Sequence, residues 1–294
     1  MDILITALSQ GLLWALLAIG VYITYRILDT PDLSAEGTFP LGGAIAATLM
    51  VQGVSPTIAV IVAIVGGMSA GFVTGILYTK LKIPPLLSGI LTMTGLYSIN
   101  LRIMGRANIS LIGQQTIFDG VESLGIPAQF VPLIVGIICT LVVVALLHLF
   151  FHTEIGYTLR ATGDNEQMVR AQGVDTDGMK ILGLMVSNGL IAFSGSLIAQ
   201  DNGFSDISMG VGVIVIGLAS VIIGEVLFGS LSIAKRLLCV ALGSMVYRMI
   251  IALVLNLGMN PIDLKLISAI VLTITLASPM VKKSLDKRNG KRGI

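Results

Sequence analysis

Charged side chains are scarce in this sequence. Asp, Glu, Lys and Arg make up 12 % of the 294 residues, whereas soluble domains carry about 25 %. A chain with so little charge cannot cover a water-facing surface of its size, which argues against a soluble enzyme, a disordered protein and a nucleic-acid-binding protein. The net charge of +2 indicates no partner by itself.

Cysteine and nucleotide-binding motifs are lacking as well. Cys139 and Cys239 both lie inside apolar runs without neighbouring metal ligands, which argues against a disulfide or zinc framework. No G-x-x-x-x-G-K-[ST] sequence occurs, so ATP-driven work by this protein would require another subunit. An intramembrane metalloprotease would need H-E-x-x-H, which is also absent.

Long apolar runs fill most of the chain. A bilayer-spanning helix needs about 20 apolar residues, so the sequence has room for roughly nine or ten spans and no soluble domain. The runs do not alternate between apolar and polar residues as membrane strands do. We therefore expect an all-α polytopic bundle forming one transmembrane domain over residues 1–294. The runs lie at 3–25, 41–53, 57–79, 84–104, 129–151, 179–200, 210–228, 237–256 and 262–281.

Basic residues in the short loops predict the orientation. The first run lacks a positive n-region and a cleavage site, so we expect it to be a retained span. With the N-terminus outside, most basic loop residues lie inside, as the distribution of Lys and Arg in membrane proteins requires. The C-terminus would then be cytoplasmic. The basic groups concerned are Lys80, Lys82, Arg160, Arg170, Lys235, Arg236 and six residues of the tail 281–294.

Two polar segments interrupt the apolar pattern in a related way. Asp32-Leu33-Ser34 precedes the second run, and Asp206-Ile207-Ser208 precedes the seventh. Nearby Pro and Gly residues predict a broken helix near 30–42. Because five runs separate the two helices, they would point in opposite directions, as in an inverted repeat. The alternative for each segment is an ordinary helix N-cap, a position that favours Asp and Ser.

The inner loop 152–178 predicts a short surface helix. Asp164 can cap its start, with Gln167 closing a capping box. Glu166 lies in the first turn, where it suits the helix dipole, and Gly173 can end the helix in a left-handed conformation. A helix of about two turns is not stable alone in water. It therefore requires a packing partner, either its own bundle or another subunit.

This loop resembles the coupling loop of ABC-importer permeases of the branched-chain amino-acid and ribose type. Leu159-Arg160-Ala161, Gly163, Asn165 and Gly173-Val174 fit that pattern. The resemblance implies a permease that itself holds no cofactor. Its partners would be a second permease copy, two ATPases that carry ATP-Mg, an extracytoplasmic substrate-binding protein and the lipid bilayer of the bacterial cytoplasmic membrane. The coupling residues it implies are Gly163, Asp164, Asn165, Glu166, Gln167, Met168, Val169, Arg170, Ala171 and Gly173.

The substrate is suggested by two shorter resemblances. Leu33 to Gly37, read as Leu-Ser-Ala-Glu-Gly, and Gly224-Glu225-Val226 resemble a subgroup linked to amino-acid import, with aromatic amino acids as candidates. In the sugar permeases the related element is D-L-S-x-G, and Glu36 is an extra residue in that pattern. An amino acid is therefore favoured over a sugar.

Polar side chains within the apolar zone are candidates for the substrate path. A charge at the centre of a span costs about 2.5–3.5 kcal/mol and requires a partner or water. Glu36 could hold a substrate ammonium or pair with Arg26, and Glu225 could pair with Lys235 or Arg236. The candidate path residues are Ser34, Glu36, Thr92, Thr94, Asn100, Ser187, Asn188, Asp206 and Ser208.

An ion-gradient-driven secondary transporter is the alternative function. It would require acidic coupling residues, and Glu36, Asp206 and Glu225 could serve. The capped helix in the inner loop favours the ABC importer, because a self-sufficient carrier needs no docking element.

Overall fold

The computed structural model describes residues 2–123, 125–228 and 232–257, together with positions 266, 269, 270 and 273. Apart from those four positions, the predicted ninth run and the basic tail lie outside the described residues. The elements are α1 (Asp2–Tyr22), η1 (Ile23–Ile27), α2 (Ala35–Val51), α3 (Pro56–Thr79), α4 (Pro85–Met104), β1 (Asn108–Ser110), α5 (Ile117–Glu122), η2 (Ala128–Phe130), α6 (Val131–Phe151), α7 (Glu154–Asp164), α8 (Glu166–Ala171), α9 (Thr176–Asn202), β2 (Phe204–Asp206), η3 (Ile207–Gly210), α10 (Val213–Phe228) and α11 (Ile233–Asn256).

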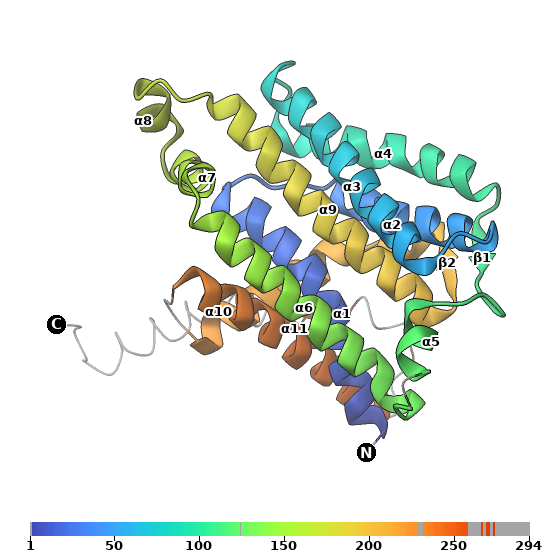
Figure 1. Cartoon of the computed structure of the whole chain (residues 1–294). Coiled ribbons are helices and arrows are strands. Elements are labelled where there is room, and N and C mark those ends of the chain that lie inside the picture. Colours follow the sequence, from blue (N-terminus) through green and yellow to red (C-terminus); the bar gives the residue numbers. More distant parts are fainter. Residues whose placement is uncertain are drawn as a thin grey trace, which may run out of the picture.

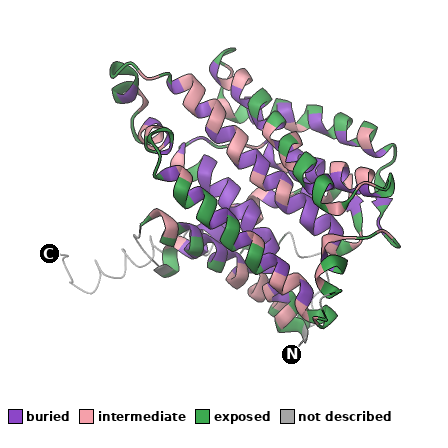
Figure 2. Ribbon diagram, viewed as in Figure 1, coloured by how far each residue is buried: buried purple, intermediate pink, exposed green. Residues whose placement is uncertain are grey.

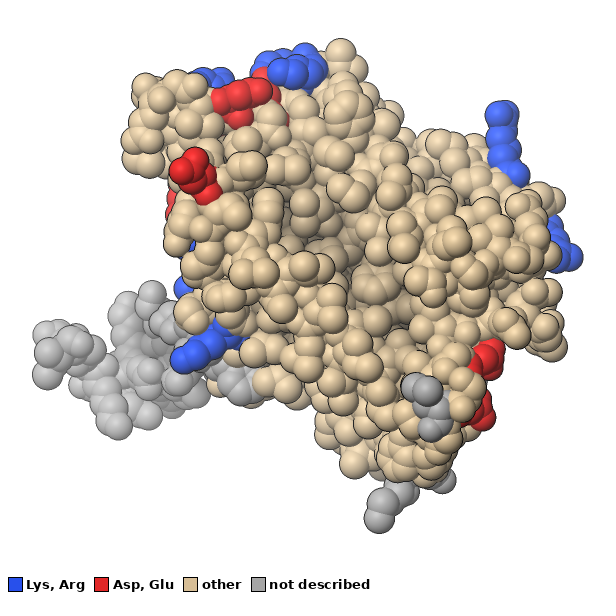
Figure 3. Space-filling model, in the orientation of Figure 1, with Lys and Arg blue, Asp and Glu red and all other residues tan. Residues whose placement is uncertain are grey.

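The architecture is that of a polytopic helical membrane protein (Figure 1). Within the described residues, six segments are long and apolar enough to cross a bilayer. Helix α2, with 17 residues, is shorter than a full span. Charged side chains gather toward the edges of the face shown in Figure 3, and the broad area between them carries none. That uncharged band is the surface expected to face lipid.

Helix α9 lies at the centre of the bundle and is its most buried long element, together with α1 (Figure 2). Small residues allow its neighbours to approach closely. A Cβ atom at Gly42 of α2 would lie 2.0 Å from the carbonyl oxygen of Ala192, and one at Gly71 of α3 would lie 2.3 Å from that of Leu184. These helices therefore meet backbone to backbone, a contact that small residues make possible in lipid.

The first helix ends in an irregular segment rather than running directly into the next. A π-helical turn, η1, follows α1, and Asp29 then adopts a positive φ of 50°. Residues 28–34 are not helical, and α2 begins at Ala35 and continues through Pro40. The break that the sequence predicts near 30–42 therefore extends only as far as residue 34.

Helices α2 and α10 begin close together. Oε1 of Glu36, in the first turn of α2, accepts a hydrogen bond from the N–H of Gly212 at 3.1 Å, just before α10 starts. From there α2 leads toward the strands, with which it is in contact, whereas α10 leads to Glu225, which pairs with Arg26 in η1. The two helices thus start close together and run apart.

The expectation of an all-α fold is wrong in one small region. Strands β1 and β2 form an antiparallel pair in which Asn108 faces Asp206 and Ser110 faces Phe204. We call this side of the molecule the β1–β2 end, and the opposite side, which carries α7 and α8, the α8 end (Figure 1).

Candidate functional site

The predicted surface helix exists as α8, but its cap differs from the prediction. Asn165, not Asp164, is the N-cap, and its side-chain oxygen accepts a hydrogen bond from the N–H of Met168 at 3.0 Å. Asp164 instead ends α7, a helix that the sequence did not predict. Gly173 follows α8 with φ of +85°, the left-handed conformation expected after a helix end.

Ion pairs hold α8 against α9. Glu166 lies 2.6 Å from the Lys180 ammonium of α9 and 2.8 Å from the Arg170 guanidinium one turn further along α8. The hydrogen bond from Lys180, which outweighs the partial burial, lowers the pKa of the Glu166 carboxyl. Glu166 therefore stays ionised at neutral pH and fixes α8 to the start of α9.

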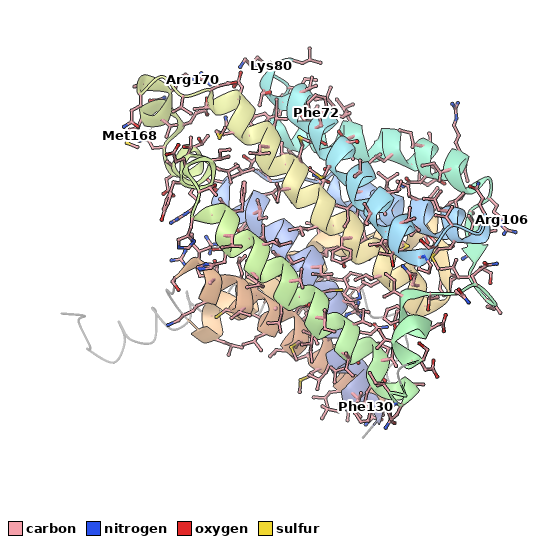
Figure 4. All side chains as sticks on the ribbon, in the orientation of Figure 1. Phe72, Lys80, Arg106, Phe130, Met168 and Arg170 are labelled. Carbon is pink, nitrogen blue, oxygen red and sulfur yellow. The ribbon has the colours of Figure 1, made fainter. Side chains whose placement is uncertain are left out.

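A second acidic residue gathers the basic groups of this end. Asp177 in α9 lies 3.3 Å from Arg170, and 3.6 Å from Lys80 and from Lys82 in the α3–α4 connection. Arg170 and Lys80 lie near each other at the α8 end in Figure 4. Three of the basic residues that the sequence predicted to share one side, Lys80, Lys82 and Arg170, therefore share one end of the molecule.

The two faces of α8 differ in exposure. Val169 is 2 % exposed and packs against its own chain, whereas Met168 is 49 % exposed and points away from the bundle (Figure 4). Ala171 and Gln167 are exposed as well. Val169, which the sequence offered as a contact for a partner, is thus unavailable, and Met168 and Ala171 form the free face.

Helix α7 connects this end to the first helix. A Cβ atom at Gly163 would lie 1.8 Å from the carbonyl oxygen of Ile27 in η1, so only glycine allows this approach. Leu159 of the same helix is fully buried. A shift of α7 would therefore move the end of η1 with it.

Asn188 of α9 organises the irregular segment before α2. Its Nδ2 donates to Oδ2 of Asp32 at 2.9 Å, and its Oδ1 accepts from the hydroxyls of Ser34 at 3.1 Å and Thr38 at 2.7 Å. Asp32 also accepts from the N–H of Ser34 at 2.8 Å. Ser34 and Asn188, both predicted path residues, are thus fully buried partners in a structural network.

A cavity of about 360 Å³ lies between α2, α4 and η3 and is lined in part by predicted residues. We call it the α2–α4 cavity. Glu36, Thr94, Asn100 and Ser208 all contribute to its wall. Tyr97 also lines it and was not predicted, although its position three residues before Asn100 places both on one face of α4.

The other predicted path residues lie elsewhere. The Thr92 hydroxyl accepts a hydrogen bond from Thr74 at 2.9 Å and lines a separate groove between α3 and α4. The Ser187 hydroxyl donates to the carbonyl oxygen of Gly20 at 2.7 Å and so joins α9 to α1. Asp206 belongs to β2, outside the cavity wall.

The intramembrane charges pair differently from the sequence prediction. Nε of Arg26 donates to Oε1 of Glu225 at 2.7 Å, and a second hydrogen bond joins the same two side chains. Arg26 is therefore not the partner of Glu36, and the predicted pairing of Glu225 with Lys235 or Arg236 is wrong.

One sequence pattern associated with enzymes is accounted for by a helix. Gly67-Met68-Ser69-Ala70-Gly71 matches G-x-S-x-G, but it lies within α3 rather than at a strand-to-helix turn, and Ser69 donates to the carbonyl oxygen of Val65. Within the part of the chain that the structure describes, no group of three or more His, Cys, Asp and Glu side chains could hold a metal ion.

Comparison with known proteins gives a consistent result. The family model for the permease component of the branched-chain amino acid transport system matches residues 3–277. The chain is 46 % identical to a tyrosine transport system permease protein of Clostridioides difficile, covering 98 % of this chain and 95 % of that protein. It is 38 % identical to an uncharacterized protein of Rickettsia prowazekii, covering 95 % and 98 % respectively. An autoinducer 2 import system permease protein of Yersinia enterocolitica is 29 % identical over 74 % of this chain and 59 % of its own length. No solved structure matches.

Proposed function

The chain belongs to the family of permease components of branched-chain amino acid transport systems, and from this premise we propose that it is the membrane subunit of an ATP-driven importer. Two such permease copies would form the path. Two ATPases would carry ATP-Mg on the cytoplasmic side, and a substrate-binding protein would deliver substrate from outside. The setting would be the bacterial cytoplasmic membrane.

The observation that carries this proposal is the free face of α8. Six residues form this helix, too few for stability in water, and ion pairs to α9 hold it in place. Met168 and Ala171 nevertheless remain uncovered. A rigidly mounted helix with an exposed apolar face suits docking into a groove of another subunit.

The contacts of α8 supply a route from such a partner to the middle of the bundle. A displacement of α8 would be passed to α9 through Glu166 and Lys180. Two turns further along α9, Asn188 holds Asp32 and Ser34 before α2. A partner at the α8 end would thereby move the start of α2, which borders the α2–α4 cavity.

An inverted repeat would account for the arrangement around this cavity. Helix α3 packs on α9 as α11 packs on α1, and α2 and α10 start near each other and run apart. In our proposal α1–α3 and α9–α11 are related halves that place the substrate path near the midplane. Together with α4, α6 and the run 262–281, the chain would have nine spans.

Orientation follows from the α8 end. Lys80, Lys82 and Arg170 gather there, and basic loops favour the cytoplasmic side. We therefore place α8 in the cytoplasm and the β1–β2 end outside. This arrangement puts the N-terminus outside, and nine spans would put the C-terminus inside.

An aromatic amino acid is the proposed substrate, and L-tyrosine is the first to test. The support is the 46 % identical relative named as a tyrosine transport system permease protein, whose match covers nearly the whole chain. The α2–α4 cavity, with the Tyr97 ring and the Glu36 carboxylate in its wall, fits a ligand with an apolar body and a polar head.

Substitution Ala171→Glu tests the docking role. It places a carboxylate on the free face of α8, where a partner would have to bury it unpaired at a cost of about 1–3 kcal/mol or more. We expect the variant to insert and fold, to lose co-purification with the ATPase and to lose ATP-dependent uptake of tyrosine.

The matched control is Ala128→Glu, which makes the same change at an exposed alanine at the opposite end of the molecule. It should co-purify with the ATPase as the wild type does. Normal co-purification and uptake in Ala171→Glu would show that α8 is not the coupling element.

A further inference from the structure

Asn100, which lines the α2–α4 cavity, has a buried polar atom without a partner. Asn100 is fully buried. Its Nδ2 donates to the carbonyl oxygen of Gly37 at 3.1 Å, whereas its Oδ1 has no hydrogen-bond partner among the described residues. Exchanging the two amide atoms would set oxygen against oxygen, so the contact with Gly37 fixes the orientation. An unsatisfied buried acceptor destabilises the protein, and a ligand with a donor group would remove that cost.

Glu36 adds a negative charge to the same wall. One carboxylate oxygen accepts a hydrogen bond from the N–H of Gly212, and none of the ten residues that line the cavity is basic. Arg26, which the sequence suggested as the partner of Glu36, forms an ion pair with Glu225 instead. The carboxylate therefore lacks a cationic partner in the cavity wall.

The hydroxyl groups of the wall have already used their hydrogens. Thr94 donates to the carbonyl oxygen of Ile90 at 2.8 Å, and Ser208 donates to the carboxylate of Asp206. Each hydroxyl can therefore only accept a hydrogen bond from a ligand. Nδ2 of Asn100 is used by Gly37. Apart from the hydroxyl of Tyr97, a residue that is 56 % exposed, the side-chain polar groups of the wall that remain free for a ligand are acceptors.

We propose that the α2–α4 cavity binds the ammonium group of the transported amino acid, with Glu36 and Oδ1 of Asn100 as its acceptors. An ammonium supplies several donors and a positive charge, which match an acceptor-rich, negatively charged wall. A carboxylate would be repelled by Glu36 and must face the open side, and the Tyr97 ring can contact either the cation or the aromatic body. This inference rests on the proposed amino-acid transport.

Three probes test the ligand class on the full chain reconstituted in lipid nanodiscs. L-tyrosine carries both charged groups, tyramine carries only the ammonium, and 3-(4-hydroxyphenyl)propionate carries only the carboxylate. We expect equilibrium binding of the first two and not of the third. Absence of binding by both amines, or equal binding by the acid, would overturn the proposal.

Two cavity variants test the residues. Glu36→Gln keeps an oxygen for the N–H of Gly212 but removes the charge, and Asn100→Ala removes the free acceptor. Each substitution should raise the Kd for tyramine about tenfold to a hundredfold, which corresponds to the loss of one hydrogen bond to a charged group. Glu225→Gln, which changes a carboxylate outside the cavity wall, should leave binding unchanged. A thermal unfolding profile for each variant verifies folding, and unchanged tyramine affinity in folded Glu36→Gln would contradict the assignment.

Uptake by the complete transporter separates this inference from the proposed function. ATP-dependent tyrosine uptake with an unchanged KM in both cavity variants would overturn the ammonium site and leave the importer proposal intact. Binding of both amines without any ATP-dependent uptake by the wild type would overturn the importer proposal and retain the cavity as an ammonium site.

Discussion

The segments before α2 and α10 have the same local chemistry in different surroundings. In each, an Asp carboxylate accepts a hydrogen bond from the N–H of the Ser two residues later, at 2.8 Å for Asp32 and 2.7 Å for Asp206. A short side chain that can bond to the backbone two residues on favours this turn wherever it occurs. The shared turn is thus a property of the tripeptide.

The two segments differ in the partner of the second carboxylate oxygen. That of Asp32 accepts from Asn188 in the central helix at 2.9 Å. That of Asp206 accepts from Asn108, in the neighbouring strand, at 3.2 Å, in an exposed setting. A hydrogen bond is worth more where its loss would leave buried groups unsatisfied. The first segment is therefore held as part of the core, and the second as part of the rim.

The largest expected effect concerns the helices that follow the two turns. In Gly42→Ala the new Cβ would lie 2.0 Å from the backbone oxygen of Ala192, so α2 and α9 must separate. In Gly217→Ala of α10 it would lie 2.8 Å from the Val21 side chain, which can move. We expect Gly42→Ala to lower the free energy of unfolding by about 3 kcal/mol or more, at or beyond the upper end for overpacked cores. The measurement is thermal or denaturant unfolding in detergent.

For Gly217→Ala the loss should stay below about 1.5 kcal/mol, because a side chain rather than a backbone must give way. Equal losses in the two glycine variants would show that the two helices are packed alike, contrary to the comparison.

An intermediate effect should follow from removing the carboxylates themselves. Asp32→Ala leaves the N–H of Ser34 and the amide of Asn188 without their acceptor, and the expected loss of unfolding free energy is about 2–3 kcal/mol. Asp206→Ala, its counterpart at the rim, should cost less than about 1 kcal/mol, because water replaces the lost bonds. Unfolding in detergent measures both, and a larger loss for Asp206→Ala would reverse the assignment of core and rim.

The smallest expected effect is a dependence on pH. The hydrogen bond from Ser208, which outweighs slight burial, lowers the pKa of Asp206 below its ordinary value. A carboxyl with a lowered folded-state pKa contributes stability above its unfolded pKa of about 3.9 and loses it as the pH falls through the folded-state value. The stability difference between wild type and Asp206→Asn should therefore be constant above about pH 5 and shrink in more acidic buffer. A difference that grows on acidification would contradict this sign.

Hydropathy predicted the helices well because spans are long and uniformly apolar. The run at 57–79 corresponds to α3, Pro56–Thr79. Strands β1 and β2 were missed because three-residue strands have no readable period, and their partners lie almost a hundred residues apart. The N-cap of α8 was predicted one residue too early, because Asp and Asn serve equally well as N-caps. The position where α7 ends decides between them.

The sequence also predicted some of the residues that line the α2–α4 cavity. Glu36 and Asn100 were candidates because polar groups are costly in a membrane. The burial and the unpaired Oδ1 of Asn100, and the absence of a basic partner for Glu36 in the cavity wall, depend on how α2, α4 and η3 meet. A local sequence pattern does not contain that information. Asn188 was a candidate for the path, yet its role in holding Asp32 and Ser34 required the three-dimensional contacts.

Asn188 has a consequence for how this protein can evolve. One amide joins a carboxylate and two hydroxyls from the irregular segment before α2 and the first turn of α2, and no other side chain of that size offers both an acceptor and a donor in the same plane. A substitution at this position would leave Asp32, Ser34 and Thr38 wrongly matched at once. We therefore expect related sequences to change these four positions together rather than one at a time.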